Sequence, residues 1–192
     1  MPYPKDHAEK SRGKILASAY KFFVWKGFDA TSIDEIMQDC QMTRGAFYWH
    51  FQSKTQLYRE AIVHAALQSR LAGDKPQDVS EQAWLGELLD AYLDKDTSAK
   101  TEWPCPLAFF VSDVTHREPD VRHAYTKAFS AMNAHIHGHA NRYAECREGT
   151  VLAVTAMLIG AVAITRTIDD DLLRGRLLDA CRELAAGQLG LE

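Results

Sequence analysis

Apolar residues recur every three or four positions along almost the whole chain, which is the spacing that gives an α-helix one buried face. Strict alternation of apolar and polar residues, the pattern of a half-buried β-strand, is nearly absent. The pattern therefore predicts an all-α protein. The expected helices cover residues 8–26, 31–40, 44–50, 55–71, 80–93, 107–115, 119–143, 148–168 and 170–189.

Residues that favour helix ends mark the first three of these helices. Gly27 follows the first helix and suits a left-handed C-terminal cap. Thr31 is expected to cap the second helix, and Asp34, three residues further on, is expected to complete a capping box with it. Thr43 is the expected N-cap of the third helix. Only residues 41–43 separate the second and third helices, so the pair is a candidate helix-turn-helix.

The third expected helix has two faces of different chemistry. Phe47 falls on the side that packs against the second helix, and Phe51 joins it just beyond the helix end. The side chains left for the major groove of DNA and its rims are Arg44, Gly45, Ala46, Tyr48 and Trp49. Arg44 can donate two hydrogen bonds to one guanine, which reads sequence. The side chains that can reach phosphates, which position a protein without specifying sequence, are Tyr48, His50 and Lys54.

The run from Gly27 to Leu57, GFDATSIDEIMQDCQMTRGAFYWHFQSKTQL, resembles the TetR family of repressors. The resemblance rests on the Thr-Arg-Gly-x-x-Tyr-Trp-His-Phe core, followed by Ser-Lys and a leucine. The DNA-binding residues that it implies are Ser32, Thr43, Arg44, Gly45, Ala46, Tyr48, Trp49, His50 and Lys54. In one departure, Gln41-Met42 stands where the family usually has Gly-Val, which predicts a slightly strained turn.

The resemblance also implies how the chain is organised. Residues 1–54 would form the helix-turn-helix DNA-binding domain, and residues 55–192 a larger helical domain for ligand binding and dimerisation. A homodimer of this kind is expected to bind an approximately palindromic double-stranded operator and to release it on binding a small apolar inducer. The residues expected at the ligand cavity are Trp84, Trp103, Cys105, Phe109, Tyr125, Phe129, Met132 and Met157. The residues expected to pair across the two-fold axis are Val151, Val154, Met157, Gly160 and Ala161.

Charge and composition modify this picture only slightly. The 192 residues carry a formal net charge of −4, but residues 1–60 hold 9 Lys+Arg against 7 Asp+Glu, and residues 61–192 hold 13 against 19. The small positive excess therefore lies where DNA binding is expected. The longest apolar stretch, Val151 to Ile164, is too short to span a membrane, and no signal segment is seen, so a cytoplasmic protein without a membrane partner is expected. Neither HExxH nor a Gly-rich phosphate loop occurs, so neither an enzyme nor a cofactor is expected.

Cys105 lies between Pro104 and Pro106, just before an expected helix. A helix N-terminus favours a thiolate, and the resemblance extends to a subgroup of the family with a cysteine at this point, which implies a redox or electrophile sensor. Glu102 would oppose a low thiol pKa, and Arg117 could offset it. The alternative is a small buried residue that fills space.

Three histidines lie close together on one expected helix. His135 and His139 share a face at a spacing that can hold a metal ion, but no carboxylate or fourth ligand is evident near them or near His137. A solvated, interfacial or pH-responsive face is the alternative, and no metal site is predicted. Two other classes of function stay open: a metal- or redox-binding helical module without DNA binding, and an enzyme built on a helical bundle.

Overall fold

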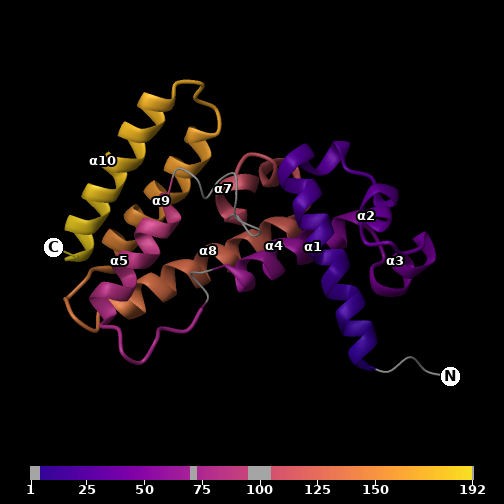
Figure 1. Cartoon of the computed structure of the whole chain (residues 1–192), viewed down its shortest axis with the longest axis horizontal. Coiled ribbons are helices and arrows are strands. Elements are labelled where there is room, and N and C mark those ends of the chain that lie inside the picture. Colours follow the sequence, from indigo (N-terminus) through magenta and orange to yellow (C-terminus); the bar gives the residue numbers. More distant parts are fainter. Residues whose placement is uncertain (1–4, 70–72, 95–104, 192) are drawn as a thin grey trace.

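The structure, a computed structural model, describes residues 5–69, 73–94 and 105–191. Every regular element in these ranges is a helix, which confirms the all-α prediction (Figure 1). The elements are α1 (Lys5–Ala30), α2 (Ile33–Asp39), α3 (Arg44–His50), α4 (Lys54–Gln68), α5 (Glu81–Tyr92), α7 (Pro106–Phe110), the 3-10 helix η2 (Val114–His116), α8 (Pro119–Ala140), α9 (Glu148–Thr165) and α10 (Asp171–Leu189). Helix α3 has the bounds that the sequence predicts.

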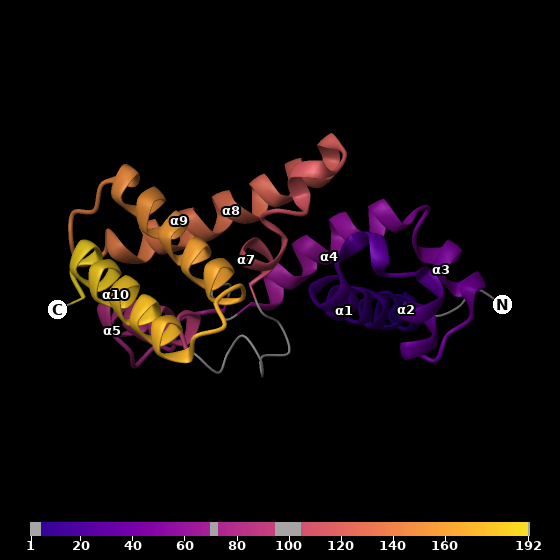
Figure 2. The same cartoon turned by 90° about the horizontal axis from the view of Figure 1, so that it is seen from above.

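The helices form an elongated molecule whose two ends are joined by a pair of packed helices. Helices α1, α2 and α3 gather at one end, whereas α5, α9 and α10 form the other (Figure 1). Helices α4 and α8 pack against each other between the two ends, and α9 lies beside α10 along one flank (Figure 2). Because α4 also packs against α1, the domain boundary expected between residues 54 and 55 falls at the start of a helix that both ends share.

The end of α1 carries a kink at Gly27, whose φ of 76° and ψ of 172° are not helical. Glycine suits this position because it has no Cβ to clash at positive φ. The Thr31 hydroxyl turns back to the Phe22 and Gly27 carbonyl oxygens, at 3.2 and 2.7 Å. Thr31 is therefore not the cap of α2, and that prediction is wrong by one residue. Ser32 is the N-cap, and Glu35 completes the capping box.

A continuous apolar core runs through both ends of the molecule. Phe47 and Phe51 are buried in it, as the sequence predicts, and they fix α3 and the turn after it in this core. Truncating a buried Phe to Ala typically costs about 3–5 kcal/mol, so these two rings hold the helix-turn-helix together. The outer face of α3 is thereby left to solvent.

Three helix ends in the second half differ from the expected ones. Helix α7 stops at Phe110 and is followed by η2, where one helix to residue 115 is expected. Helix α8 ends at Ala140, because the Asn141 side chain accepts a hydrogen bond from the Cys146 backbone N–H at 3.0 Å and closes a turn. Helix α9 ends at Thr165, and Asp170 caps α10 by accepting from two backbone N–H groups.

Helix α9 is longer than the apolar stretch from which it was expected, and it is apolar along its length. The sequence predicts that this segment is too short to span a membrane, but the helix has 18 residues, with a mean hydropathy of 1.8. It is long and apolar enough to cross a membrane by length and composition, and 44% of it is buried inside the protein. A core helix of a protein without a membrane passes the same test, so the finding is weak evidence for a span.

Candidate nucleic-acid interface

The turn between α2 and α3 sets the geometry of the candidate interface. Gln41 has a φ of +57° and is the one non-glycine residue with positive φ among those described. This conformation puts the side chain close to its own carbonyl oxygen, which is the strain that the missing family glycine predicts. The turn sends α3 away from α2 with its first residues in solvent.

Two aromatic side chains dominate the exposed face of α3. Trp49 is 78% exposed and Tyr48 is 56% exposed, although large aromatic side chains are usually buried. Gly45 and Ala46 lie at the helix start, and neither has a side chain that would keep a second surface at a distance. The face therefore offers stacking and hydrogen-bonding groups beside a close-approach point.

Arg44 is the first residue of α3, and its exposed side chain is held by a neighbouring carboxylate. Its Nη1 lies 3.0 Å from Oδ2 of Asp34 on α2. A side-chain hydrogen bond with Tyr48, and then the charge of Asp34, raise the pKa of Arg44. The exposed ion pair contributes little to stability. It keeps the guanidinium beside the first turn of α3.

The hydroxyls of Ser32 and Thr43 have different surroundings. The Ser32 hydroxyl donates to the Glu35 carboxylate at 2.8 Å and accepts from the Glu35 backbone N–H at 3.2 Å. Thr43 occupies the N-cap position of α3 as predicted, but its side chain makes no capping hydrogen bond. The Thr43 hydroxyl is exposed at the end of α3 where the helix dipole favours an anion such as phosphate.

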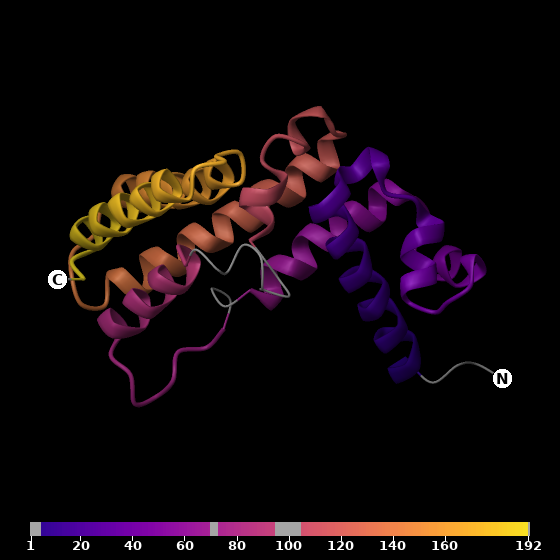
Figure 3. The same ribbon diagram turned by 45° about the horizontal axis from the view of Figure 1, so that its top comes forward.

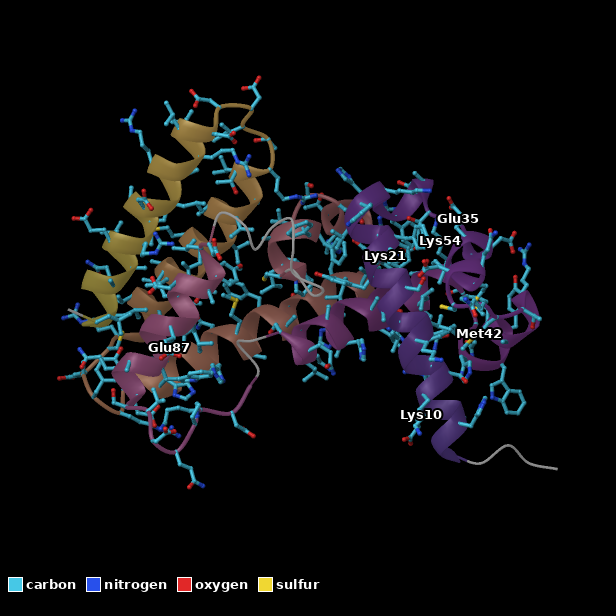
Figure 4. All side chains as sticks on the ribbon, in the orientation of Figure 1. Lys10, Lys21, Glu35, Met42, Lys54 and Glu87 are labelled. Atoms are coloured by element: carbon cyan, nitrogen blue, oxygen red, sulfur yellow. The ribbon has the colours of Figure 1, made fainter. Side chains whose placement is uncertain are left out.

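Lys54 and His50 flank α3 on the side of α4. The Lys54 ammonium lies 4.4 Å from the centre of the Phe28 ring, and burial lowers the Lys54 pKa. Burial, and then the charge of Arg12, lower the pKa of His50 below the ordinary value of 6.5. In Figure 4, Lys54 lies close to Glu35 at this end of the molecule, whereas Glu87 lies at the other.

The residues predicted to line a ligand cavity lie in the second half of the chain, most of them in or against the same apolar core. Trp84 and Met132 are buried, and Phe109, Tyr125 and Phe129 are partly buried against the core. Trp103 lies outside the described residues. Met157 lines an open hollow of about 610 Å³ between α9 and α10.

Cys105 is the N-cap residue of α7 and is partly buried. Burial raises the pKa of its thiol, and this outweighs the lowering by Tyr92 and by the backbone N–H groups of Ala108 and Leu107. The helix N-terminus acts in the expected direction, but the expectation of a favoured thiolate is wrong. Arg117 gives no help, because its guanidinium is bound to other carboxylates.

The face expected to form the dimer contact is only partly accessible. Val151, Val154 and Ala161 are buried inside the protomer, so they are not free to meet a second copy. Helix α9 is apolar on all sides, and its sequence therefore does not show which side faces its own core. The exposed apolar residues of α9 and α10 are Leu152, Ile164, Leu172, Leu173 and Leu184.

The histidines of α8 have separate partners. His139 Nδ1 lies 2.5 Å from Glu81, and the rings of His135 and His139 are 4.5 Å apart. His137 turns to the Cys146 carbonyl oxygen at 3.1 Å. The described part of the chain holds no group of three or more His, Cys, Asp or Glu side chains that could bind a metal ion.

A set of contacts that the sequence does not predict joins this interface to the rest of the molecule. Arg117, just before α8, forms ion pairs with Asp29 at the end of α1 and with Asp113. Residues 29 and 117 are 88 positions apart, so no local pattern could have paired them. Phe28, beside Asp29, also lies under both Arg117 and Lys54.

The fold and the interface define a class: an all-helical protein with an N-terminal helix-turn-helix and a larger helical part. Comparison with known proteins shows which family of this class the N-terminal region resembles. The family described as bacterial regulatory proteins, tetR family, matches residues 15–61. The N-terminal helix-turn-helix region therefore resembles the TetR family.

Curated relatives match over part of the chain. The HTH-type transcriptional regulator AcrR of Shigella flexneri is 41% identical over 56 residues, which cover 29% of this chain and 26% of that protein. An uncharacterised HTH-type transcriptional regulator of Lactococcus lactis subsp. lactis is 27% identical over 129 residues, or 66% of each chain. The chain thus matches about a quarter of the length of the first of these curated relatives.

Solved structures share the fold over nearly the whole chain. The reduced form of Escherichia coli NemR has a TM-score of 0.78 and 15% identity, covering 93% of this chain and 96% of that one. A TetR transcriptional regulator of Chloroflexus aurantiacus has a TM-score of 0.73 and 21% identity, covering 96% of each. The second half therefore has the same helical architecture, although its residues differ.

Proposed function

We propose that this protein is a dimeric transcriptional repressor that binds a specific operator through α3 and is released by a small molecule. The observation that carries the proposal is the exposed face of α3, where Arg44 stands at the helix start beside Gly45 and Tyr48 and Trp49 are open to solvent. Similarity over 56 residues to the regulator AcrR and to a protein described as a probable acrEF/envCD operon repressor supports the role. An arginine at the start of a recognition helix can pair with guanine in the major groove.

Selection of bound sequences from random duplex DNA, followed by gel shifts, tests the proposal. Arg44→Ala should weaken binding to the selected operator by about 1–3 kcal/mol and relax preference at one base position. Lys54→Ala should weaken operator and scrambled DNA alike and flatten the salt dependence. Arg122→Ala, an exposed arginine on α8, is the matched control and should do neither. Equal affinity of the wild type for operator and scrambled DNA would contradict the proposal.

Dimerisation is proposed to use the exposed apolar side chains of α9 and α10. Leu152 and Leu184 project from these neighbouring helices, and the hollow lined by Met157 and Leu184 lies between them. Clustered exposed apolar residues mark an interaction surface. A second copy would cover the apolar surface of α9 that its own chain leaves open, as expected of a cytoplasmic protein.

Ligand response is proposed for the interior of the second half. Two buried polar atoms, Trp84 Nε1 and His135 Nε2, have no hydrogen-bond partner among the described residues. Buried polar groups are normally paired, so such atoms suit a ligand with a polar group on an apolar body. The ligand must favour a conformer that binds operator poorly, because equal affinity for both conformers shifts nothing. Thermal-shift hits that never weaken operator binding would contradict this mechanism.

A redox or electrophile response through Cys105 is the second candidate. Two backbone N–H groups at the start of α7 approach the thiol, and the NemR structure of similar fold is of a reduced form. Because burial raises the thiol pKa, alkylation by iodoacetamide at pH 7 should be slower than that of free cysteine and should accelerate as the pH rises. Operator release by hydrogen peroxide should be lost in Cys105→Ser. Equal release from both proteins would leave Cys105 a packing residue.

A further inference from the structure

Arg117 connects two parts of the molecule that are far apart in sequence. Its Nη1 and Nη2 donate to the two carboxylate oxygens of Asp29, at 3.1 and 2.8 Å. The same guanidinium donates to Asp113, from Nη2 at 2.6 Å and from Nε at 3.3 Å. Asp29 ends the kinked turn of α1, whereas Arg117 follows η2. Figure 3 shows the start of α8 lying against this end of α1.

The guanidinium is sheltered from water, although its partner on α1 is not. The Arg117 side chain is 12% exposed and that of Asp113 is 24% exposed, so water screens their contact less than that of a surface pair, whereas the Asp29 side chain is 81% exposed. The two-pronged contact with Asp29 also fixes direction, because the planar guanidinium matches both carboxylate oxygens at once. The contact therefore restrains the angle at which α1 meets the segment before α8.

Asp113 anchors Arg117 to the core. The Tyr58 hydroxyl donates to Asp113 at 2.5 Å, and the Tyr58 ring is buried in α4. The same ring contacts Phe110 of α7 at 5.1 Å and Phe28 at 5.1 Å between centroids. The segment from α7 to Arg117 is thus held by α4, and it holds the end of α1 in turn.

The end of α1 supports a residue of the proposed DNA interface. The Lys54 ammonium lies 4.4 Å from the Phe28 ring centre and 3.5 Å from the Asp29 carbonyl oxygen. The Arg117 guanidinium lies 4.3 Å from the same ring centre. Fixing Phe28 and Asp29 therefore fixes the place from which Lys54 can reach a phosphate.

We propose that Arg117 is a positioning residue for DNA binding, which sets the angle between α1–α3 and the rest of the protomer by holding Asp29. The inference rests on the proposed function. In a dimer, this angle sets the separation of the two recognition helices, and hence the separation of half-sites that the protein accepts. Loosening the contact should broaden the accepted separations, whereas a general loss of folded protein lowers binding to every separation equally.

Asp29→Asn tests the proposal with little risk to folding, because the Asp29 side chain is 81% exposed and the substitution keeps its shape. Affinity is measured for the selected operator and for versions with one or two base pairs added between half-sites. The wild type should prefer its own separation by at least about tenfold, and Asp29→Asn should reduce that ratio to about twofold or less. Asp120→Asn removes another exposed aspartate paired with an arginine, Arg59, and should keep the wild-type ratio.

Hydrogen exchange gives a second measurement that needs no DNA. Amides at residues 28–31 and 114–118 should exchange faster in Asp29→Asn, while amides of α10 keep the wild-type rate. An unchanged spacing ratio, or unchanged exchange at these residues, would overturn the positioning role. If the wild type selects no DNA sequence, the proposed function fails, and exchange alone then decides whether the contact restrains the two parts.

Discussion

Gln41 is the residue whose backbone most clearly departs from what its side chain prefers. Its φ of +57° lies in the left-handed region, where a Cβ costs about 1–2 kcal/mol. The residue stays there because α2 and α3 are both fixed by their buried residues, such as Ile36 and Phe47. The strain is local, and the burial of α2 and α3 outweighs it.

Gln41→Gly should therefore stabilise the protein. Glycine removes the Cβ clash but adds freedom to the unfolded chain, so a net gain of about 0.5–1 kcal/mol in the free energy of unfolding is expected. Chemical denaturation measures the change. Gln38→Gly, on the exposed face of α2, is the control and should destabilise by about 1 kcal/mol. A Gln41→Gly protein no more stable than the wild type would show that the turn is not strained.

The lowered pKa of Glu35 predicts that the stability of the protein depends on pH. Its ion pair with Lys26, and then hydrogen bonds from the Ser32 backbone and hydroxyl, lower the Glu35 pKa from 4.5 to about 2. A carboxyl with a lowered pKa contributes stability above its unfolded pKa, and this contribution is lost as the pH falls toward the folded value. Glu35→Gln should lower the Tm at pH 7, and the Tm difference from the wild type should shrink between about pH 4.5 and pH 2. A difference that stays constant over this range would contradict the assignment.

At the scale of elements, α3 and α4 begin in different ways. The Ser53 hydroxyl caps α4 by accepting from the Gln56 backbone N–H at 3.0 Å. Thr43 stands at the same position of α3 without such a bond. A recognition helix whose N-terminal N–H groups are not capped by a side chain keeps them available to a phosphate.

The two caps should consequently respond differently to alanine. Ser53→Ala should destabilise by about 1 kcal/mol, as N-cap removal usually does. Thr43→Ala should change stability by less than about 0.5 kcal/mol, which is the range of exposed surface substitutions, yet weaken operator binding several-fold. Thermal unfolding and gel shifts on the same two proteins make the comparison. Equal stability losses would contradict the structure, and unchanged operator binding in Thr43→Ala would remove its proposed DNA role.

At the scale of the whole molecule, one end carries the proposed DNA interface and the other an uncovered apolar surface. Helices α4 and α8 join the two ends (Figure 1). A protein that binds a palindrome needs a fixed distance between two such interfaces, and a dimer through α9 and α10 would supply it. The exposed leucines of these helices are the surface available for that contact.

Leu184→Glu should break this dimer, because it places a charge among apolar side chains. Light scattering should show a monomer, and operator affinity should fall by about 10²–10⁴-fold, since the second half-site is no longer tethered. Leu67→Glu changes another exposed leucine, on α4, and should leave both properties unchanged. A wild-type protein that is already monomeric at working concentration would contradict the proposed dimer.

The sequence by itself determined the helical class, the helix-turn-helix and the bounds of α3. These follow from short-range rules: helical periodicity, residues that favour helix ends, and a turn of only three residues. The exposed face of α3 could also be predicted from the sequence, because Phe47 and Phe51 identify the side that packs inward. Even the strain at Gln41 followed from the absence of a glycine.

Only the tertiary structure decided the rest, because it depends on which distant surfaces meet. The sequence of a helix that is apolar on all sides, such as α9, does not show which side is buried. Packing therefore decided that Val151 and Val154 are buried and that Leu152 is exposed. Burial, which a sequence does not state, reversed the expected shift of the Cys105 thiol pKa. The contact between Asp29 and Arg117 spans 88 positions, and folding creates it by bringing the end of α1 against the start of α8.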